Sequence, residues 1–369
     1  MLPQFVPFLH YARAKQLSWP LMLTILALAG IGFTVLYSAG EMNWQPWAGR
    51  QLVRFAVGLL LLLTVACVEL RVWQQLAYPF YLLSLLLLLL VDAFGFVGMG
   101  AQRWLKLGPI QVQPSELMKI AIVMALARYF APLSLGEVRR PARLLIPVVM
   151  ILFPALLVAA QPDLGGALML LAVGGVMLMV AGVRWWKFAA VLGLAAVALP
   201  ILWHRLHDYQ KKRLTTFLNP DADPLGAGYH ITQSKIALGN GGILGKGLGQ
   251  GTQSYLDFLP EKHTDFIFTM VGEELGLVGA LIVLTLYTLL SLQCSIIGLK
   301  SHSHYGRLVA IGIGATCSIY LLINTGMVMG LLPVVGEPLP LLSYGGTAML
   351  TILIALGMVQ NVKIYQEQR

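Results

Sequence analysis

Long runs of apolar residues are the feature that most limits how this chain can fold. A helix needs about 20 mostly apolar residues to cross the hydrocarbon core of a bilayer. We find ten such runs, at residues 18–39, 51–69, 76–96, 114–130, 143–160, 165–183, 187–204, 265–298, 306–330 and 341–361. Only 11% of the residues are charged, against roughly 25% in an average soluble domain. Because no water-soluble core could bury so much apolar surface, we predict an all-α integral membrane protein with ten transmembrane helices.

The distribution of basic residues predicts how these spans are oriented. An even number of spans places both termini on one side, and short cytoplasmic loops are enriched in Lys and Arg. The short loops on the opposite side carry only Arg50, Arg103 and Lys106. The termini and the loops on their side carry Arg13, Lys15, Arg71, Arg139, Arg140, Arg143, Arg184, Lys187, Lys300, Arg307, Lys363 and Arg369. We therefore predict cytoplasmic termini, and the net charge of +9 needs no nucleic-acid partner to explain it.

The longest segment between spans separates the seventh and eighth runs. Residues 205–264 are rich in Pro, Gly, Asp and Asn, a composition typical of loops. We predict a single polytopic domain over residues 1–369, with 205–264 as a large extracytoplasmic loop within it. The glycine-rich string 239–251 lacks the Gly and Ser/Thr positions of a phosphate-binding P-loop. It is either a set of tight turns or a backbone site for an anion.

Ionisable residues at membrane depth are costly and are functional candidates, and those on the predicted outer side cluster. Glu116 and Lys119 stand three residues apart at the start of the fourth span, on one helix face. They form either a structural ion pair or part of a substrate site. Asp163 begins the sixth span in the same way, as a helix cap or as a site residue. Glu273 and Glu274 are adjacent on the eighth span, and we expect them to line a hydrophilic interior.

Asp265 enters the eighth span among aromatic residues and is the strongest candidate for chemistry. The helix macrodipole stabilises an anion at a helix N-terminus, whereas apolar neighbours raise the pKa of a carboxyl group. These opposing effects suit a general base, which must be charged yet still basic. An acid in the first turn of a helix is also an ordinary structural feature. No Cys/His metal site and no Ser-His-Asp arrangement is readable.

Seven sequence blocks resemble those of one protein family. They are Gly100–Leu105, Gln113–Lys119, Gln161–Gly165, Pro224–His230, Phe258–Phe266, Glu273–Gly276 and Pro340–Gly346. Their order and spacing are similar to those of the SEDS proteins (shape, elongation, division and sporulation), over roughly residues 20–360. The stretches Tyr229–Lys235 and Gly251–Ser254 look like the members that serve elongation rather than division.

The resemblance implies an activity and a mechanism. It implies a peptidoglycan glycosyltransferase that polymerises lipid II into glycan strands for cell elongation and rod shape. Asp265 is then the catalytic residue, acting as the base in an inverting transfer that releases undecaprenyl pyrophosphate. Positive charge on Arg103 and Lys119 would stabilise this leaving group. The substrate-binding residues that we expect are Arg103, Glu116, Lys119, Asp163, Glu261 and His263.

The same resemblance suggests cofactors, partners and a location. A divalent cation, magnesium or manganese, could supplement the basic residues, its identity being unknown, and no nucleotide or organic cofactor is expected. The expected partners are lipid II, the growing glycan strand, a class B penicillin-binding protein (a transpeptidase) and other elongation-complex proteins. The expected location is the bacterial cytoplasmic (inner) membrane, with the active site on its periplasmic face. A lipid II flippase and a non-catalytic scaffold of the elongation machinery remain alternatives.

Overall fold

Helices make up most of the chain in the computed structural model, which describes residues 16–45, 47–98, 101–108, 110–205, 211, 215–219, 226–255 and 261–366. The helices at the ten predicted runs are α2 (Trp19–Ala39), α3 (Ala48–Cys67), α4 (Leu70–Phe94), α5 (Pro114–Phe130), α7 (Pro141–Ala160), α8 (Leu164–Val180), α9 (Trp185–Arg205), α13 (Ile267–Lys300), α14 (His304–Val328) and α15 (Gly346–Gln366). The shorter helices within the described residues include α6 (Leu135–Val138), α11 (Ala227–Asn240) and α12 (Thr252–Tyr255). The family-like residues Gly100, Pro224, Leu225 and 258–260 lie outside the described ranges, as does part of the predicted loop 205–264.

Seven of these helices are long and apolar enough to cross a membrane. They are α2, α3, α4 over Leu70–Val91, α7, α13, α14 and α15. The other three predicted runs coincide with α5 and α8, of 17 residues each, and with α9, whose apolar part is Trp185–Leu194. The described helices therefore support a multi-pass membrane protein, while the number ten stays a prediction.

The last predicted run begins five residues too early, at 341 instead of Gly346. Pro338 and Pro340 precede this helix, and proline lacks the N–H that a helix interior needs. Leu341 has a φ of 72°, a left-handed conformation that α-helices do not contain. The segment 331–345 between α14 and α15 is consequently a loop, in spite of its apolar composition.

A small sheet corrects the all-α prediction. Strands β1 (Phe96–Gly98), β2 (Ala101–Leu107) and β3 (Ile110–Val112) pair antiparallel in the order β1-β2-β3. Phe96 lies opposite Trp104 and Leu105 lies opposite Val112. In β2 the polar residues Arg103 and Lys106 are interspersed with apolar ones, so polar and apolar positions partly alternate. A search for membrane spans overlooks so short a pattern. The sheet joins α4 to α5 and carries Arg103.

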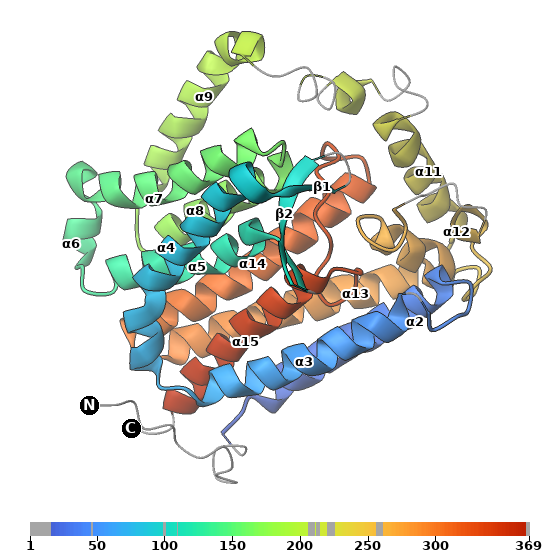
Figure 1. Cartoon of the computed structure of the whole chain (residues 1–369), viewed down its shortest axis with the longest axis horizontal. Coiled ribbons are helices and arrows are strands. Elements are labelled where there is room, and N and C mark those ends of the chain that lie inside the picture. The colour runs from blue at the N-terminus through green and yellow to red at the C-terminus, as the bar shows by residue number, and fades with distance from the viewer. Residues whose placement is uncertain are drawn as a thin grey trace.

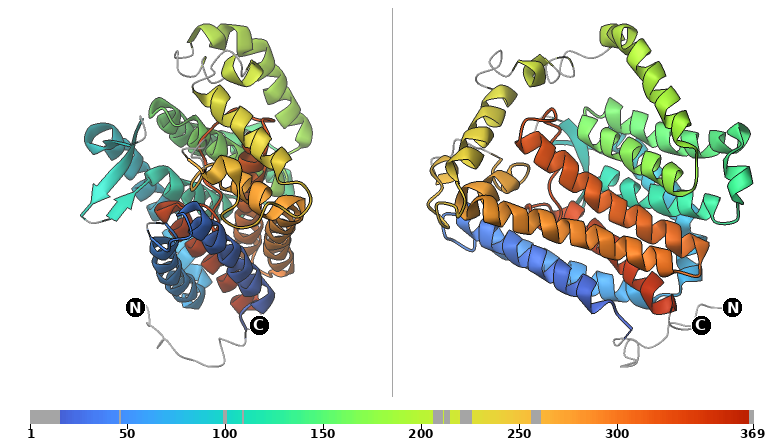
Figure 2. Two further views of the ribbon diagram at one scale, coloured as in Figure 1. Left: turned by 90° about the vertical axis from the view of Figure 1, so that its right-hand side faces the viewer. Right: turned by 180° about the vertical axis from the view of Figure 1, so that it is seen from behind.

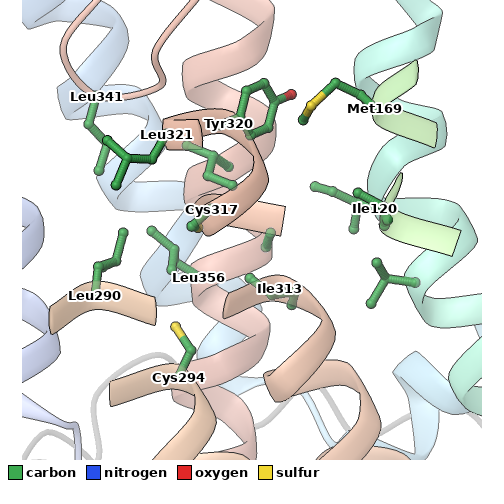
Figure 3. Packing of buried hydrophobic residues seen from close by; sticks show 14 of the residues in the cluster. Ile120, Met169, Leu290, Cys294, Ile313, Cys317, Tyr320, Leu321, Leu341 and Leu356 are labelled. Carbon is green, nitrogen blue, oxygen red and sulfur yellow. The ribbon is translucent and has the colours of Figure 1, made fainter. Parts of the chain in front are cut away.

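The core lies where α5, α8, α13, α14 and α15 pack together (Figure 1). Most residues of α14 and α15 are buried, as expected of helices enclosed by other helices. Figure 3 shows the layer that contains Leu290, Cys294, Ile313, Cys317 and Leu356, with the hydroxyl oxygen of Tyr320 pointing toward the side of Met169. In contrast, α9 stands away from the other helices in both Figure 1 and Figure 2.

The over-long eighth run is two helices joined at a break. Gly276 has φ 68° and ψ −164°, outside the helical region. A Cβ on Gly276 would collide with the backbone nitrogen of Gly245, so this position requires glycine. Backbone hydrogen bonds of 2.9–3.1 Å join the glycine-rich segment to the break, from Lys246 to Glu273, from Gly247 to Glu274, from Leu277 to Gly242 and from Val278 to Ile243. These bonds satisfy the groups that the break exposes, and they favour the tight-turn interpretation of the glycine string.

The expectation that Glu273 and Glu274 line a hydrophilic interior was wrong. Both residues are buried. The Glu273 Oε1 atom accepts hydrogen bonds from the backbone N–H of Gln253, at 2.9 Å, and from the Thr252 hydroxyl, at 3.2 Å. The Glu274 Oε1 atom accepts one from the Ser38 hydroxyl, at 2.6 Å. Each carboxylate therefore stabilises the packing of neighbouring segments against α13.

Candidate active site

The predicted site residues meet at one end of the helix bundle. The starts of α5, α8 and α13 come together there with the end of α14 and the loop 331–345, as the hydrogen bonds and ion pairs below show. Figure 1 shows β2 and the loop that precedes α15 at this end. The opposite end holds Gln360, whose side chain bonds the backbone of Ser18.

Asp265 lies just before α13 rather than in its first turn. The helix begins at Ile267 with Phe266 as its N-cap, and residues 261–266 form a turn. In this turn the Phe266 N–H donates to the Glu261 carbonyl oxygen at 3.3 Å, and the Thr264 hydroxyl donates to Glu261 Oε2 at 2.8 Å. Asp265 is half-buried. Its backbone is therefore held by contacts from outside the helix.

The Asp265 carboxylate lies against a glycine turn in the loop 331–345. Gly336 has a φ of +72°, and a Cβ at this residue would be 3.3 Å from Asp265 Oδ2. The Asn324 side chain of α14 holds the two segments together. Its Nδ2 donates to the backbone oxygens of Asp265 and Glu337, both at 2.9 Å. Sequence reasoning missed Asn324 and Gly336, because neither belongs to an acidic or basic motif.

Lys119 is the centre of a buried polar network. Its Nζ donates to Glu116 Oε1 at 2.7 Å, to Glu337 Oε2 at 2.7 Å and to the Tyr320 hydroxyl at 3.0 Å. The Tyr320 hydroxyl in turn donates to Glu116 Oε2 at 2.6 Å. The ammonium has three N–H donors, and all three are used. The structure thus shows the ion pair of Glu116 and Lys119, and the Lys119 side chain is only 1% exposed.

Glu337 is the member of this network that the sequence did not reveal. It lies between Gly336 and Pro338, and an isolated acid between two apolar runs was a signal that could have marked it. Burial raises the pKa of the Glu337 carboxyl to about 8, while the charge of Lys119 opposes the rise. Lys119 lies between two buried carboxyl groups, those of Glu337 and Glu116.

Asp163 and Arg103 form a second polar group beside this network. Asp163 Oδ1 accepts a hydrogen bond from the Gly166 N–H at 3.0 Å, so Asp163 is the N-cap of α8. Arg103 Nη1 is 3.6 Å from Asp163 Oδ1, and Nη2 donates to the Pro162 carbonyl oxygen. With 19% of its side chain exposed, Arg103 is more accessible to a ligand than Lys119. Gly165, near Asp163 in the chain, lies close to the Lys119 network, since a Cβ added to Gly165 would be 3.2 Å from Glu337 Oε1.

His263 lies in an aromatic group next to Asp265. Its ring stacks on Trp47 with the centroids 3.9 Å apart, and its carbonyl oxygen accepts a hydrogen bond of 2.8 Å from the Tyr344 N–H. Burial lowers the pKa of His263, with the charge of Glu261 opposing the effect, so the ring is neutral at pH 7. Glu261 itself stabilises the turn that carries Asp265. Trp47 and Tyr344 add aromatic surface that sequence reasoning did not assign to the site.

The described residues do not fit a protein-built metal site. No three side chains of His, Cys, Asp or Glu come together in the part of the chain that the structure describes. Asp163 already accepts a hydrogen bond from Gly166, and Lys119 donates to both Glu116 and Glu337. Tyr320 also donates to Glu116. We therefore derive no step of the chemistry through a metal ion.

Known proteins resemble this chain over nearly its full length. The family model that describes a cell cycle protein, FtsW/RodA/SpoVE, matches residues 19–368. The peptidoglycan glycosyltransferase MrdB of Escherichia coli is 43% identical over 352 residues, which cover 94% of this chain and 93% of MrdB. Two solved structures are similar. One, from work on a peptidoglycan synthase complex that coordinates polymerization and crosslinking, has a TM-score of 0.83 and 32% identity, covering 96% of this chain and 99% of that one. The other, the rod shape determining protein RodA of Thermus thermophilus, has a TM-score of 0.71 and 31% identity, covering 96% and 98%. The resemblance read from the sequence blocks is thus confirmed, and the chain belongs to the FtsW/RodA/SpoVE family of cell cycle proteins.

Proposed function

We propose that this protein is a peptidoglycan glycosyltransferase that polymerises lipid II for cell elongation and rod shape. The observation that carries this proposal is the position of Asp265, a half-buried carboxylate held at the end of the bundle where Arg103 is also found. The name of MrdB, the E. coli relative, supports the assignment. The stretches Tyr229–Lys235 and Gly251–Ser254, which look like those of elongation members, support the elongation role.

The proposed reaction uses Asp265 as the general base. The carboxylate takes the proton of the acceptor 4-hydroxyl while the hydroxyl oxygen attacks the anomeric carbon of the donor. The bond from that carbon to the pyrophosphate oxygen breaks, and undecaprenyl pyrophosphate leaves with the electron pair. An α-linked donor thus gives a β-linked product in one inversion, so no covalent enzyme intermediate is needed.

Arg103 is the residue that we assign to the pyrophosphate. Its guanidinium is partly exposed, and a fork of N–H donors suits phosphate oxygens. Asp163, whose Oδ1 is 3.6 Å from Arg103 Nη1, orients this guanidinium. Lys119 was expected to share the role, but its three donors are engaged by Glu116, Glu337 and Tyr320. We therefore propose that Lys119 and Glu116 support the substrate site by fixing its buried wall.

The turn before α13 supplies the proposed sugar contacts. His263 is neutral and stacks on Trp47, and such a pair offers an apolar face and a ring N–H to a sugar. Glu261 is also a proposed substrate residue, because it stabilises this turn. A divalent cation bound mainly by the pyrophosphate needs few protein ligands. Magnesium or manganese stays a proposal, tested by the loss of polymerisation in EDTA and its recovery on adding either ion.

The proposed topology has ten spans with cytoplasmic termini in the bacterial cytoplasmic membrane and the active site on the outer face. This arrangement follows from the positions of the basic residues and keeps the polyprenyl tail in lipid while the sugars are in water. The proposed partner is a class B penicillin-binding protein, supported by the peptidoglycan synthase complex from which a similar structure comes.

The proposal is tested with purified protein and labelled lipid II, alone and with the transpeptidase partner. Long glycan strands are the expected product in at least one of the two reactions. A flippase would instead move labelled lipid II across sealed vesicles without forming glycan, and a scaffold would give neither result. Absence of glycan with and without the partner, from protein that remains folded, would contradict the proposed function.

A further inference from the structure

Asn324 occupies a position that the proposed mechanism does not use. Its side chain lies at 0% exposure near the end of α14. The amide nitrogen carries two hydrogens, and it donates to two backbone oxygens, those of Asp265 and Glu337, each at 2.9 Å. Both partners are carbonyl oxygens, which only accept hydrogen bonds, so the amide atom that faces them is the nitrogen.

The two acceptors belong to segments that no regular structure fixes. Asp265 precedes the first residue of α13, and Glu337 lies in the loop 331–345. Gly336 precedes Glu337 and lies so near Asp265 that a Cβ on Gly336 would be 3.3 Å from Asp265 Oδ2. The side chain of Glu337 also binds this loop to α5, because its Oε2 accepts a hydrogen bond from Lys119 Nζ at 2.7 Å. A rigid helix thus holds the carboxylate-bearing turn and the glycine turn at a fixed separation.

We propose that Asn324 is a positioning residue for Asp265. By bonding both backbone oxygens, it fixes the Asp265 carboxylate relative to Gly336 and to the buried Lys119 network. It does not touch the substrate. A carboxylate displaced by about 1 Å can lose a factor of about 100 in rate, so the loss of this bridge acts on the chemical step. The inference rests on the proposed role of Asp265 as the base.

The chain offers a matched control for this residue. Asn361 of α15 is also 0% exposed, and its Nδ2 also donates to backbone oxygens, those of Val65, Ala66 and Val68. It lies next to Gln360, at the end of the bundle away from Asp265. Asn361→Ala therefore removes a comparable buried bridge without disturbing the candidate active site. A purely structural role would make the two alanine variants behave alike.

The experiment compares kcat, KM for lipid II and thermal melting of Asn324→Ala and Asn361→Ala, both in the full chain with its transpeptidase partner. We expect similar losses of melting temperature in the two variants. We also expect kcat to fall about 10- to 100-fold in Asn324→Ala alone, with KM changed less than about twofold. Equal kcat values in the two variants, or a change confined to KM, would overturn the proposal.

Two further variants keep the test decisive if Asn324→Ala does not fold. Asn324→Ser retains one donor and is expected to show an intermediate kcat. Gly336→Ala leaves Asn324 intact but places a Cβ 3.3 Å from Asp265 Oδ2 at a left-handed φ, so kcat should again fall with KM nearly unchanged. Wild-type kcat in both variants would contradict the inference. Failure of the proposed function is recognised separately, because the wild-type protein would then form no glycan from lipid II. Failure of the proposed role of Asp265 would appear as polymerisation by Asp265→Asn at the wild-type rate.

Discussion

Lys119→Met should be among the most destabilising single substitutions near the site. The variant preserves the length and much of the apolar volume of the side chain but removes the ammonium. Glu116 then loses its bonded cation, at 2.7 Å, and Tyr320 loses a hydrogen-bond donor at 3.0 Å. Removing one partner of a buried ion pair costs about 3–5 kcal/mol. We expect a loss of this size in the free energy of unfolding.

A second substitution tests whether charge is the cause. Glu116 accepts hydrogen bonds from both Lys119 and Tyr320, so it is the carboxylate most affected when the ammonium is removed. The double variant Lys119→Met/Glu116→Gln removes the ammonium and this carboxylate together. We expect it to recover about half or more of the lost stability, a coupling of about 2 kcal/mol, which lies within the range found for residues in one network.

Unfolding in mixed detergent micelles, followed by the loss of helical signal, provides the measurement. The wild type, both single variants and the double variant are compared at the same pH. A loss below about 1 kcal/mol in Lys119→Met would refute the view that removing the ammonium leaves a buried charge without its partner. A double variant no more stable than Lys119→Met would show that lost packing, not unpaired charge, dominates.

Three further predictions follow from single contacts. Arg103→Ala should lower kcat/KM for lipid II at least about tenfold, whereas Lys106→Ala, on the same strand but exposed, should leave kcat/KM unchanged; equal kcat/KM values would remove Arg103 from the pyrophosphate site. Because burial raises the pKa of Glu337 from 4.5 to about 8, the protonated carboxyl contributes stability at low pH that is lost as the pH rises toward 8; Glu337→Gln should flatten the pH dependence of unfolding over this interval, and parallel curves would contradict it. Gly276→Ala should lower the melting temperature far more than Gly175→Ala on α8, whose Cβ would meet nothing within 4 Å, and equal melting temperatures would show that the break in α13 tolerates a side chain.

The positions of the long helices could be predicted from the sequence because their cause is local. An apolar run of about 20 residues leaves few alternatives in a bilayer, and seven of the predicted runs became helices long enough to span it. The small sheet and the break at Gly276 were not predictable in this way. Both depend on contacts with other segments, and the break in particular needs the glycine-rich segment to satisfy its backbone groups.

The candidate site also has parts that local sequence predicts and parts that depend on contacts between distant segments. Glu116 and Lys119 could be paired from their spacing, since residues three apart share a helix face. Asp163 could be identified as a cap candidate from its position at a helix start. The bonds from Lys119 to Glu337 and from Asn324 to Asp265 join residues that are far apart in the chain. Only the folded arrangement shows that Lys119 has no donor left for the substrate, which moves the proposed pyrophosphate contact to Arg103.

The most direct test of the central claim is the polymerisation of lipid II by Asp265→Asn. Asparagine preserves the size of the side chain and the backbone oxygen that Asn324 bonds, but it cannot accept the proton of the acceptor hydroxyl. The variant should therefore melt like the wild type and bind lipid II, while its rate of glycan formation falls by at least about 100-fold, the contribution of a general base. Glycan formation at the wild-type rate by the folded variant would contradict the role of Asp265 and the mechanism built on it.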